Sequence, residues 1–511
     1  MNSKSTIALA ALLVATTRLA AQAPEPAGQS AHAAESITAG DVTHRVGIIA
    51  HDSMLGRDTP SRGLELTAQY VADQFRQFGL KPGGEDGTWF QRYPITRRRL
   101  DLAESKVRLE VGGVSVTAPF DRAARYVSGD IPGKSVSGPA VLVGGKMTPE
   151  AVSGMHLQDK VVLYVHDYSK KVPLNAAQVA RAIRLSRPRA IVAISNMDSA
   201  EFAARVPRSA PERFGMELRL NSPPSVEVSE AVIAPVLRAA KVSLAEIRRS
   251  SSAVARPVPG LGATVTMKET VLDSLSAPNT IGILEGSDPK LKGEYLVFSA
   301  HMDHVGITPE MGDSINNGAD DNASGTTGVI ELAEAFSRSG ARPKRSILFI
   351  TVSGEEKGLW GSRYFSEHPT VPVSQLVADI NLDMLGRNWA DTIVAIGKEH
   401  SDLGATLERV NAAHPELRMA AIDDRWPDER FYFRSDHYNF ARKGVPVLFF
   451  FNGVHPDYHR VTDSPEKINA EKESRILKLL FYLGQEIGNA PRRPQWDPES
   501  YRLIVEEPAI P

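Results

Sequence analysis

Histidine and carboxylate side chains gather after four apolar segments in the second half of the chain. The segment INNGADDNAS, residues 315–324, also places Asp320 and Asp321 side by side in a Gly- and Asn-rich turn. The polar residues that follow the apolar segments are His301, Asp303, Glu355, Glu356, Asp383, His455, Asp457 and His459. Any one of them alone would be an ordinary capping or solvated residue. Together they form a ligand set suited to zinc or a similar divalent ion.

Four buried strands are predicted to position these side chains. Residues 294–300, 345–352, 376–383 and 445–451 are short apolar runs rich in β-branched residues. Residues 324–340 have helical spacing, with Ser324 as a possible cap and Gly340 as a stop. Alternating strands and helices predict an α/β fold with an open, mostly parallel sheet flanked by helices. Ligands of such sheets bind at the carboxyl ends of the strands, where these polar residues lie.

Composition excludes several other chemistries. The chain has 511 residues and no cysteine, which rules out thiolate metal ligands and cysteine nucleophiles. Lys and Arg number 59 against 61 Asp and Glu, so the overall charge gives no reason to expect a nucleic-acid partner. Neither the G-x-S-x-G motif of serine hydrolases nor the H-E-x-x-H motif of single-zinc proteases occurs.

Residues 1–23 have the features of a secretory signal peptide. Lys4 precedes an apolar stretch from Ile7 to Ala15, and small residues follow up to Ala23. The apolar stretch is about half of the roughly 20 residues that a membrane-spanning helix needs. We therefore expect cleavage and export to the periplasm or the extracellular space, without stable membrane insertion afterwards.

Residues 129–259 predict a smaller α/β module inserted into a larger domain formed by residues 36–128 and 260–490. Strand candidates such as GPAVLVGG and QDKVVLYVHD alternate there with helix candidates. Stretches containing serine and proline, near 127–139 and 248–260, are the predicted linkers. Residues 491–511 are punctuated by proline and form a C-terminal tail without a predicted fold.

Six motifs resemble those of the M28 family of zinc peptidases: AHMDH, GADDNASG, SGEEKGLWGS, NLDMLG, SDHYNF and DYHRVTDSPEKI. The resemblance covers roughly residues 260–480, and residues 36–128 resemble the N-terminal portion of that family. The inserted module resembles the protease-associated domain that many members carry. The intervals 301 to 321, 321 to 355 and 356 to 383 span 20, 34 and 27 residues, and they fit the family.

The resemblance implies a role for each of eight residues. It places His301 and Asp383 on one zinc ion, Glu356 and His459 on a second, and Asp321 as a bridge between the two ions. It makes Glu355 the general base, Asp303 the carboxylate that orients His301, and Tyr458 a hydrogen-bond donor to the oxyanion. Asp320 would act within the turn, and His304, His437 and His455 are expected to be structural or pocket residues.

The implied activity is that of a metallo-aminopeptidase with two zinc ions per chain, acting on the N-termini of peptides or proteins. Three other functions remain open. A glutaminyl cyclase is a zinc acyltransferase that resembles the peptidases at the same positions, and M28-type carboxypeptidases or dipeptidases share the family. A metal-free binding scaffold is the third. The sequence sets neither the side-chain preference nor the oligomeric state.

Overall fold

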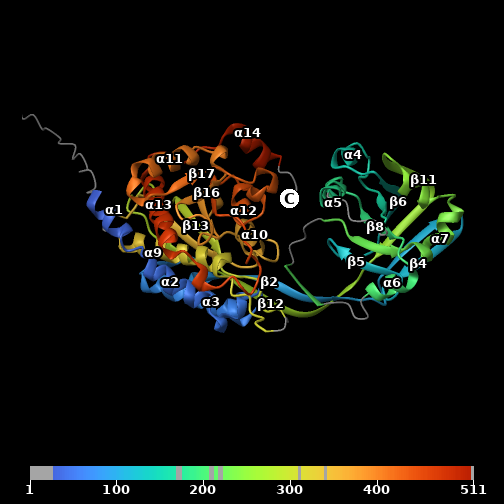
Figure 1. Ribbon diagram of the computed structural model, residues 1–511, viewed down its shortest axis with the longest axis horizontal. Coiled ribbons are helices and arrows are strands. Elements are labelled where there is room, and N and C mark those ends of the chain that lie inside the picture. The colour runs from blue at the N-terminus through green and yellow to red at the C-terminus, as the bar shows by residue number, and fades with distance from the viewer. Residues whose placement is uncertain are drawn as a thin grey trace, which may run out of the picture.

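Two lobes, each built on its own β-sheet, make up the protein (Figure 1). This computed structural model describes residues 27–167, 175–206, 212–216, 222–308, 312–338 and 342–507. The predicted signal peptide and Gly340 lie outside the described residues. None of the helices in the described part of the chain is both long and apolar enough to cross a membrane.

The larger lobe is built on a mixed ten-stranded sheet. In order across the sheet the strands are β17 (Ala420–Ile422), β16 (Thr392–Ile396), β18 (Val447–Phe451), β15 (Leu376–Asp383), β13 (Tyr295–His301), β14 (Ser346–Val352), β12 (Glu269–Leu284), β2 (Phe90–Leu100) and β9 (Glu212–Met216). The short strand β1 (Lys81–Pro82) pairs with β12. All four strands predicted from their apolar runs are present, as β13, β14, β15 and β18.

The prediction of a mostly parallel sheet is correct only for these four central strands. β13 pairs parallel with β14 and β15, and β15 pairs parallel with β18. On one flank β12, β2 and β9 are antiparallel, and on the other β16 runs antiparallel to β18. Of the flanking strands, β2 is rich in arginine and β12 mixes polar and apolar residues, unlike strands buried on both faces, whereas β16 is apolar but only five residues long.

Helices cover both faces of the larger sheet, as predicted. One face packs against α2 (Ala39–Ile49), α3 (Arg62–Gln77), α9 (Gly325–Arg338), α11 (Leu403–Ala413) and α13 (Ala470–Asn489), and α1 (Ala27–Ala34) lies beside α9 and α13. The other face packs against α10 (Trp360–Glu367) and α12 (His437–Ala441). Leu296 and Phe298 of β13 point to the first face and Val297 to the second, so the strand is buried on both sides.

The second lobe has an eight-stranded sheet. Its strands, in order, are β4 (Val114–Pro119), β3 (Lys106–Val111), β11 (Ala253–Thr266), β6 (Val136–Gly145), β7 (Val161–Val165), β8 (Ala190–Ser195), β10 (Ser225–Ser229) and β5 (Ala124–Ser128). Its helices are α4 (Pro149–Ser153) and α5 (Ala176–Leu185) on one face, α7 (Glu230–Ala239) and α8 (Leu244–Arg249) on the other, and α6 (Ser199–Arg205). Figure 1 shows α5 on the side of this lobe that faces the larger lobe.

The second lobe begins earlier and ends later than the predicted insert of residues 129–259. Strands β3, β4 and β5 precede residue 129, and β11 continues to Thr266. The Ser- and Pro-containing stretches near 127–139 and 248–260, predicted to be linkers, lie largely within the lobe, in or beside β6 and β11. The two lobes are joined instead through the long antiparallel pair β2 and β12.

Residues 491–507 of the C-terminal tail pack against the larger lobe. This segment contains α14 (Pro498–Tyr501) and a short π-helical turn (Arg502–Glu506). The indole nitrogen of Trp496 donates a hydrogen bond to the carbonyl of Gly444, and Ile504 is buried. Trp496 and Ile504 anchor this proline-rich segment, but two apolar residues show no helical or strand periodicity. The sequence therefore predicted no fold for it.

Candidate metal centre

The predicted ligands meet at the edge of the larger sheet where its parallel strands end. His301 and Asp383 are the last residues of β13 and β15. Glu356 follows β14, and His459 follows β18. Asp321 lies in the short helical turn η3 (Ala319–Ser324), directly before α9. The structure therefore brings together five residues that are up to 158 positions apart in the sequence.

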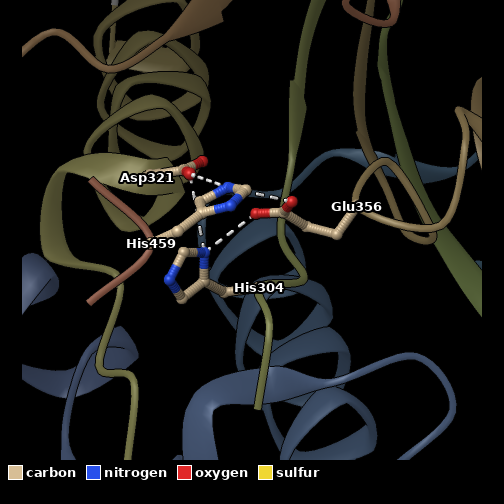
Figure 2. Close-up of side chains that lie close together, drawn as sticks. All are labelled: His304, Asp321, Glu356 and His459. Carbon is tan, nitrogen blue, oxygen red and sulfur yellow. Dashed lines mark hydrogen bonds and ion pairs between the residues drawn. The ribbon is translucent and has the colours of Figure 1, made fainter. Parts of the chain in front are cut away.

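Asp321 lies between two groups of possible ligands and turns one oxygen toward each of them. Its Oδ1 atom is 3.4 Å from Nε2 of His301, which is 3.5 Å from Oδ1 of Asp383. Its Oδ2 atom is 3.1 Å from Nε2 of His459, which is also 3.1 Å from Oε2 of Glu356 (Figure 2). This is the arrangement expected of a carboxylate shared by two cations.

These separations fit zinc. With bonds of about 2.0–2.2 Å, two ligand atoms of a tetrahedral zinc site lie roughly 3.3–3.6 Å apart. Within each group the ligand atoms lie within 4.8 Å of one another. Asp321, Glu356 and Asp383 are almost fully shielded from solvent, with side-chain exposures of 4%, 6% and 10%. Carboxylates crowded into a buried space repel one another unless cations lie between them.

The negative charge of these carboxylates also raises the pKa values of His301 and His459. Burial opposes protonation of His459, but its hydrogen bonds to Asp321 and Glu356 prevail and raise its pKa to about 10. The pKa of His301 is also raised well above its ordinary value, by Asp383 in particular, despite its burial. Because a proton and a cation compete for the same nitrogen, we expect metal binding to release protons.

His304 belongs to the second group, a position that the sequence did not predict for it. Its Nδ1 atom lies 3.0 Å from Oε1 of Glu356 and 3.6 Å from Oδ2 of Asp321, and its ring is fully buried (Figure 2). His304 was expected to be a structural or pocket residue because it matches no ligand position of the family motif. Its place in the H-x-D-H sequence, three residues after His301, was the available signal.

Glu355 and Tyr458 line a small cavity beside the ligands. Its lining includes His301, Asp321 and Asp383 and the polar residues Arg434 and Ser435. The apolar and aromatic residues of the lining are Met384, Phe431, Phe449, Phe451 and Val454. Burial raises the pKa of Glu355 well above its ordinary value, and nearby carboxylates add to this effect. Burial and the charges of Asp321 and Glu356 also raise the pKa of Tyr458, which keeps its hydroxyl protonated as a donor.

Asp303 connects the strand end of His301 with the loop that carries the two glutamates. Its carboxylate accepts hydrogen bonds from the hydroxyl of Thr59 at 3.0 Å and from the backbone N–H of Glu355 at 3.2 Å. Nδ1 of His301 lies 3.2 Å from the backbone carbonyl of Asp303 and 3.8 Å from its carboxylate. In this structure the closer partner of the His301 ring is therefore the carbonyl rather than the predicted carboxylate.

Arg57 holds together the loops that carry the candidate ligands and was not identified from the sequence. It is fully buried and donates hydrogen bonds to the carbonyls of Ile49, Met302, Asn317 and Gly318. Burial lowers its pKa to about 10, which leaves it charged at neutral pH, and Asp321 and Asp303 favour that charge. Gly318 is required next to it, because a Cβ there would lie 2.3 Å from the carbonyl of Asp321.

The turn itself is held by residues that belong to neither ligand group. Asp463 accepts hydrogen bonds from the backbone N–H groups of Asp320 and Asp321. Asp320 accepts the N–H of Gly386 at 2.6 Å and faces His455 at 3.2 Å, and it belongs to neither ligand group, in line with the expected role within the turn. Asn322, not Ser324 as predicted, accepts the first N–H of α9, at Gly325.

Comparison with known proteins places this site in a peptidase context. Residues 279–484, which contain all the ligand candidates, match the family model of Peptidase family M28. The aminopeptidase YwaD of Bacillus subtilis is 27% identical over 246 residues, covering 45% of this chain and 49% of that protein. The glutaminyl-peptide cyclotransferase of Bos taurus is 26% identical over 235 residues, covering 39% of this chain and 63% of that protein.

A solved structure matches nearly the whole chain. The aminopeptidase from Aneurinibacillus sp. strain AM-1 aligns over 92% of this chain and 98% of its own length, with a TM-score of 0.50 and 18% identity. At that identity the likeness establishes the mixed α/β fold. In sequence, the chain spans about half the length of the curated relatives it matches first.

Proposed function

We propose that this protein is an exported metallo-aminopeptidase that holds two zinc ions and removes N-terminal residues from peptides or proteins. The observation that carries the proposal is Asp321, whose two oxygens face separate groups of nitrogen and oxygen ligands. His301 and Asp383 would hold one ion, and Glu356 and His459 the other. The match to Peptidase family M28 and the likeness to an aminopeptidase of Bacillus subtilis support the same reaction.

Zinc ions bound there would supply a Lewis acid that polarises the scissile carbonyl and makes water more acidic. Glu355, in the cavity beside the ligands, accepts the proton of the attacking water and passes it to the leaving amine. Tyr458 donates its hydroxyl proton in a hydrogen bond to the oxygen that gains charge. Asp303 positions the loop of Glu355 by accepting that residue's backbone N–H.

The cavity favours cleavage near a chain end. Its carboxylates can bind a free amino group, while Phe431, Phe449 and Phe451 in the same lining fit an apolar first side chain. Trp426 packs edge-on against Phe431 and Phe451 and stacks with Trp389, so these tryptophans support that part of the lining. The second lobe would be a protease-associated domain, and export would follow from the signal sequence predicted at residues 1–23.

A glutaminyl cyclase activity is the second candidate, because one curated relative is a glutaminyl-peptide cyclotransferase. A cyclase releases ammonia from an N-terminal glutamine without shortening the chain. A carboxypeptidase or dipeptidase of the same family would instead remove the C-terminal residue or cleave only dipeptides. The products formed from one glutamine-initiated peptide therefore distinguish these reactions.

The test is metal content together with hydrolysis of a panel of aminoacyl chromogenic substrates. We expect about two zinc ions per chain in both the wild type and Glu355→Gln, with activity at least about 10²-fold lower in the variant. Glu150→Gln, at an exposed glutamate of α4, is the matched control and should retain activity. Ammonia release without shortening, or cleavage from the C-terminus alone, would replace the aminopeptidase proposal.

A further inference from the structure

A cleft of about 1630 Å³ separates α5 of the second lobe from the larger lobe. On one side it is lined by Arg181, Arg184 and Leu185 of α5. On the other side it is lined by the loop that follows Glu355 and Glu356 and by residues of α10 and α12. The predicted ligands lie outside this cleft, so it is a separate feature of the molecule.

The cleft is strongly basic. Among the described residues that line it, ten are arginine or lysine and two, Asp130 and Glu269, are acidic. The chain as a whole carries a formal net charge of −2, so positive charge is concentrated here rather than spread over the surface. A recess lined by one sign of charge focuses the electrostatic field and attracts ligands of the opposite sign.

Several of these charges are available to a ligand. Six of the ten basic residues form ion pairs: Arg98 and Arg213 with Glu269, Arg189 with Asp159, Lys357 with Asp58, and Arg363 and Arg442 with Glu367. Within the described part of the chain, Arg184, Arg187 and Lys443 have no ion-pair partner, and all three are exposed. Burial lowers the pKa of Arg181, and the charges of Arg430 from the larger lobe and of Arg184 lower it further. Arg181 is thus repelled by positive charges of both lobes, and an anion bound beside it would relieve this repulsion.

The cleft starts next to the candidate metal centre. Lys357, in its wall, is two residues beyond Glu355, which lines the cavity beside the ligands. Asn439 of α12 donates a hydrogen bond to Ser362 of α10, so the helices that border the cleft are fixed to each other. The cavity and the cleft therefore approach each other at the loop of residues 355–357.

We propose that this cleft binds acidic side chains in the downstream part of the peptide, so that the preferred substrates are peptides with acidic residues behind the cleaved end. The inference rests on the proposed aminopeptidase function and names its substrate class. A short aminoacyl substrate does not reach the cleft, so its hydrolysis reports on the proposed function alone.

The experiment compares two peptides that differ only in charge, with the zinc-loaded full-length protein. The acidic peptide is a leucine followed by four glycines and three aspartates, and the neutral peptide has three asparagines in place of the aspartates. We expect kcat/KM to be about tenfold higher for the acidic peptide at low salt, and the ratio to approach one at about 0.5 M salt. An extended chain gains about 3.3–3.6 Å per residue, so shortening the glycine spacer should remove the preference once the aspartates no longer reach the cleft.

Charge-reversal variants test whether the cleft causes the preference for the acidic peptide. Arg184→Glu and Lys443→Glu should each lower the acidic-to-neutral ratio about threefold or more, and leave hydrolysis of the short aminoacyl substrate unchanged. Arg238→Glu is the matched control for Arg184→Glu, because both arginines are exposed in the last turn of a helix of the second lobe. Lys290→Glu, at an exposed loop lysine of the larger lobe, is the control for Lys443→Glu.

Two results would overturn the inference. One is an acidic-to-neutral ratio near one, or a ratio that the control variants lower as much as the cleft variants do. The other is tighter binding of a single-stranded RNA oligonucleotide than of the acidic peptide, measured by fluorescence anisotropy with Glu355→Gln. That binding assay needs no turnover, so it decides the inference even if the short substrate is not cleaved and the proposed function fails.

Discussion

Replacing Arg57 by methionine should weaken both the fold and metal binding. The guanidinium donates four hydrogen bonds to backbone carbonyls, with lengths of 2.9 Å to Ile49, 2.9 Å to Met302, 2.6 Å to Asn317 and 2.9 Å to Gly318. Bonds from a charged donor contribute about 1.5–3 kcal/mol each, and burial of the charge opposes part of this gain. We expect Arg57→Met to lose about 4 kcal/mol of the free energy of unfolding.

Two of these carbonyls belong to the turn that leads to Asp321, and a third belongs to Met302, next to His301. Loss of Arg57 should therefore also lower zinc affinity, by about tenfold or more, as measured by competition with a chromogenic chelator. Arg345→Met is the control, because Arg345 is as deeply buried and donates to the carbonyls of Ile487 and Ala490, at the opposite end of β14.

Comparison of the two variants separates a loss of fold stability from a loss of zinc affinity. Arg345→Met should unfold at lower denaturant concentration with unchanged zinc affinity, whereas Arg57→Met should change both quantities. If Arg57→Met unfolds within about 1 kcal/mol of the wild type and binds zinc as tightly, the assigned role of Arg57 is wrong.

Three further substitutions have defined outcomes. His304→Ala should weaken binding of the second zinc ion about tenfold. At zinc concentrations that fill only the tighter site, the variant should then hold about one ion per chain. An unchanged titration would exclude His304 from the site. Tyr458→Phe should lower kcat about 10-fold or more with little change in KM, and a purely higher KM would contradict its oxyanion role. Burial lowers the pKa of His437 to about 3, below its unfolded value, so protonation of the unfolded chain should cost stability as pH falls from about 6.5 toward 3. At pH 5 this loss is about 2 kcal/mol relative to pH 7, and thermal unfolding of His437→Gln should lack it.

The central strands and the ligand edge were predictable because they depend on local signals. β13, β14, β15 and β18 are buried on both faces and are therefore nearly continuous apolar runs. His301 and Asp383 end their strands, so the rule that ligands bind at carboxyl ends placed them together before any coordinates. Their roles as zinc ligands remain predictions.

The features that the sequence did not reveal depend on contacts between distant segments. Arg57 has no unusual neighbours in the sequence, and its four acceptors come from three separate segments. The boundary of the second lobe was misplaced because β3 and β11 pair across about 150 intervening residues. The basic cleft has no sequence signature at all, since its arginines and lysines come from both lobes.

Anomalous diffraction at the zinc edge, from crystals grown with zinc, would locate the bound ions directly. We expect two peaks, about 3.5–4 Å apart, with one carboxylate oxygen of Asp321 directed at each. His301 and Asp383 should contact one peak, and Glu356 and His459 the other. A single peak, or two peaks that do not share Asp321, would contradict the two-metal account.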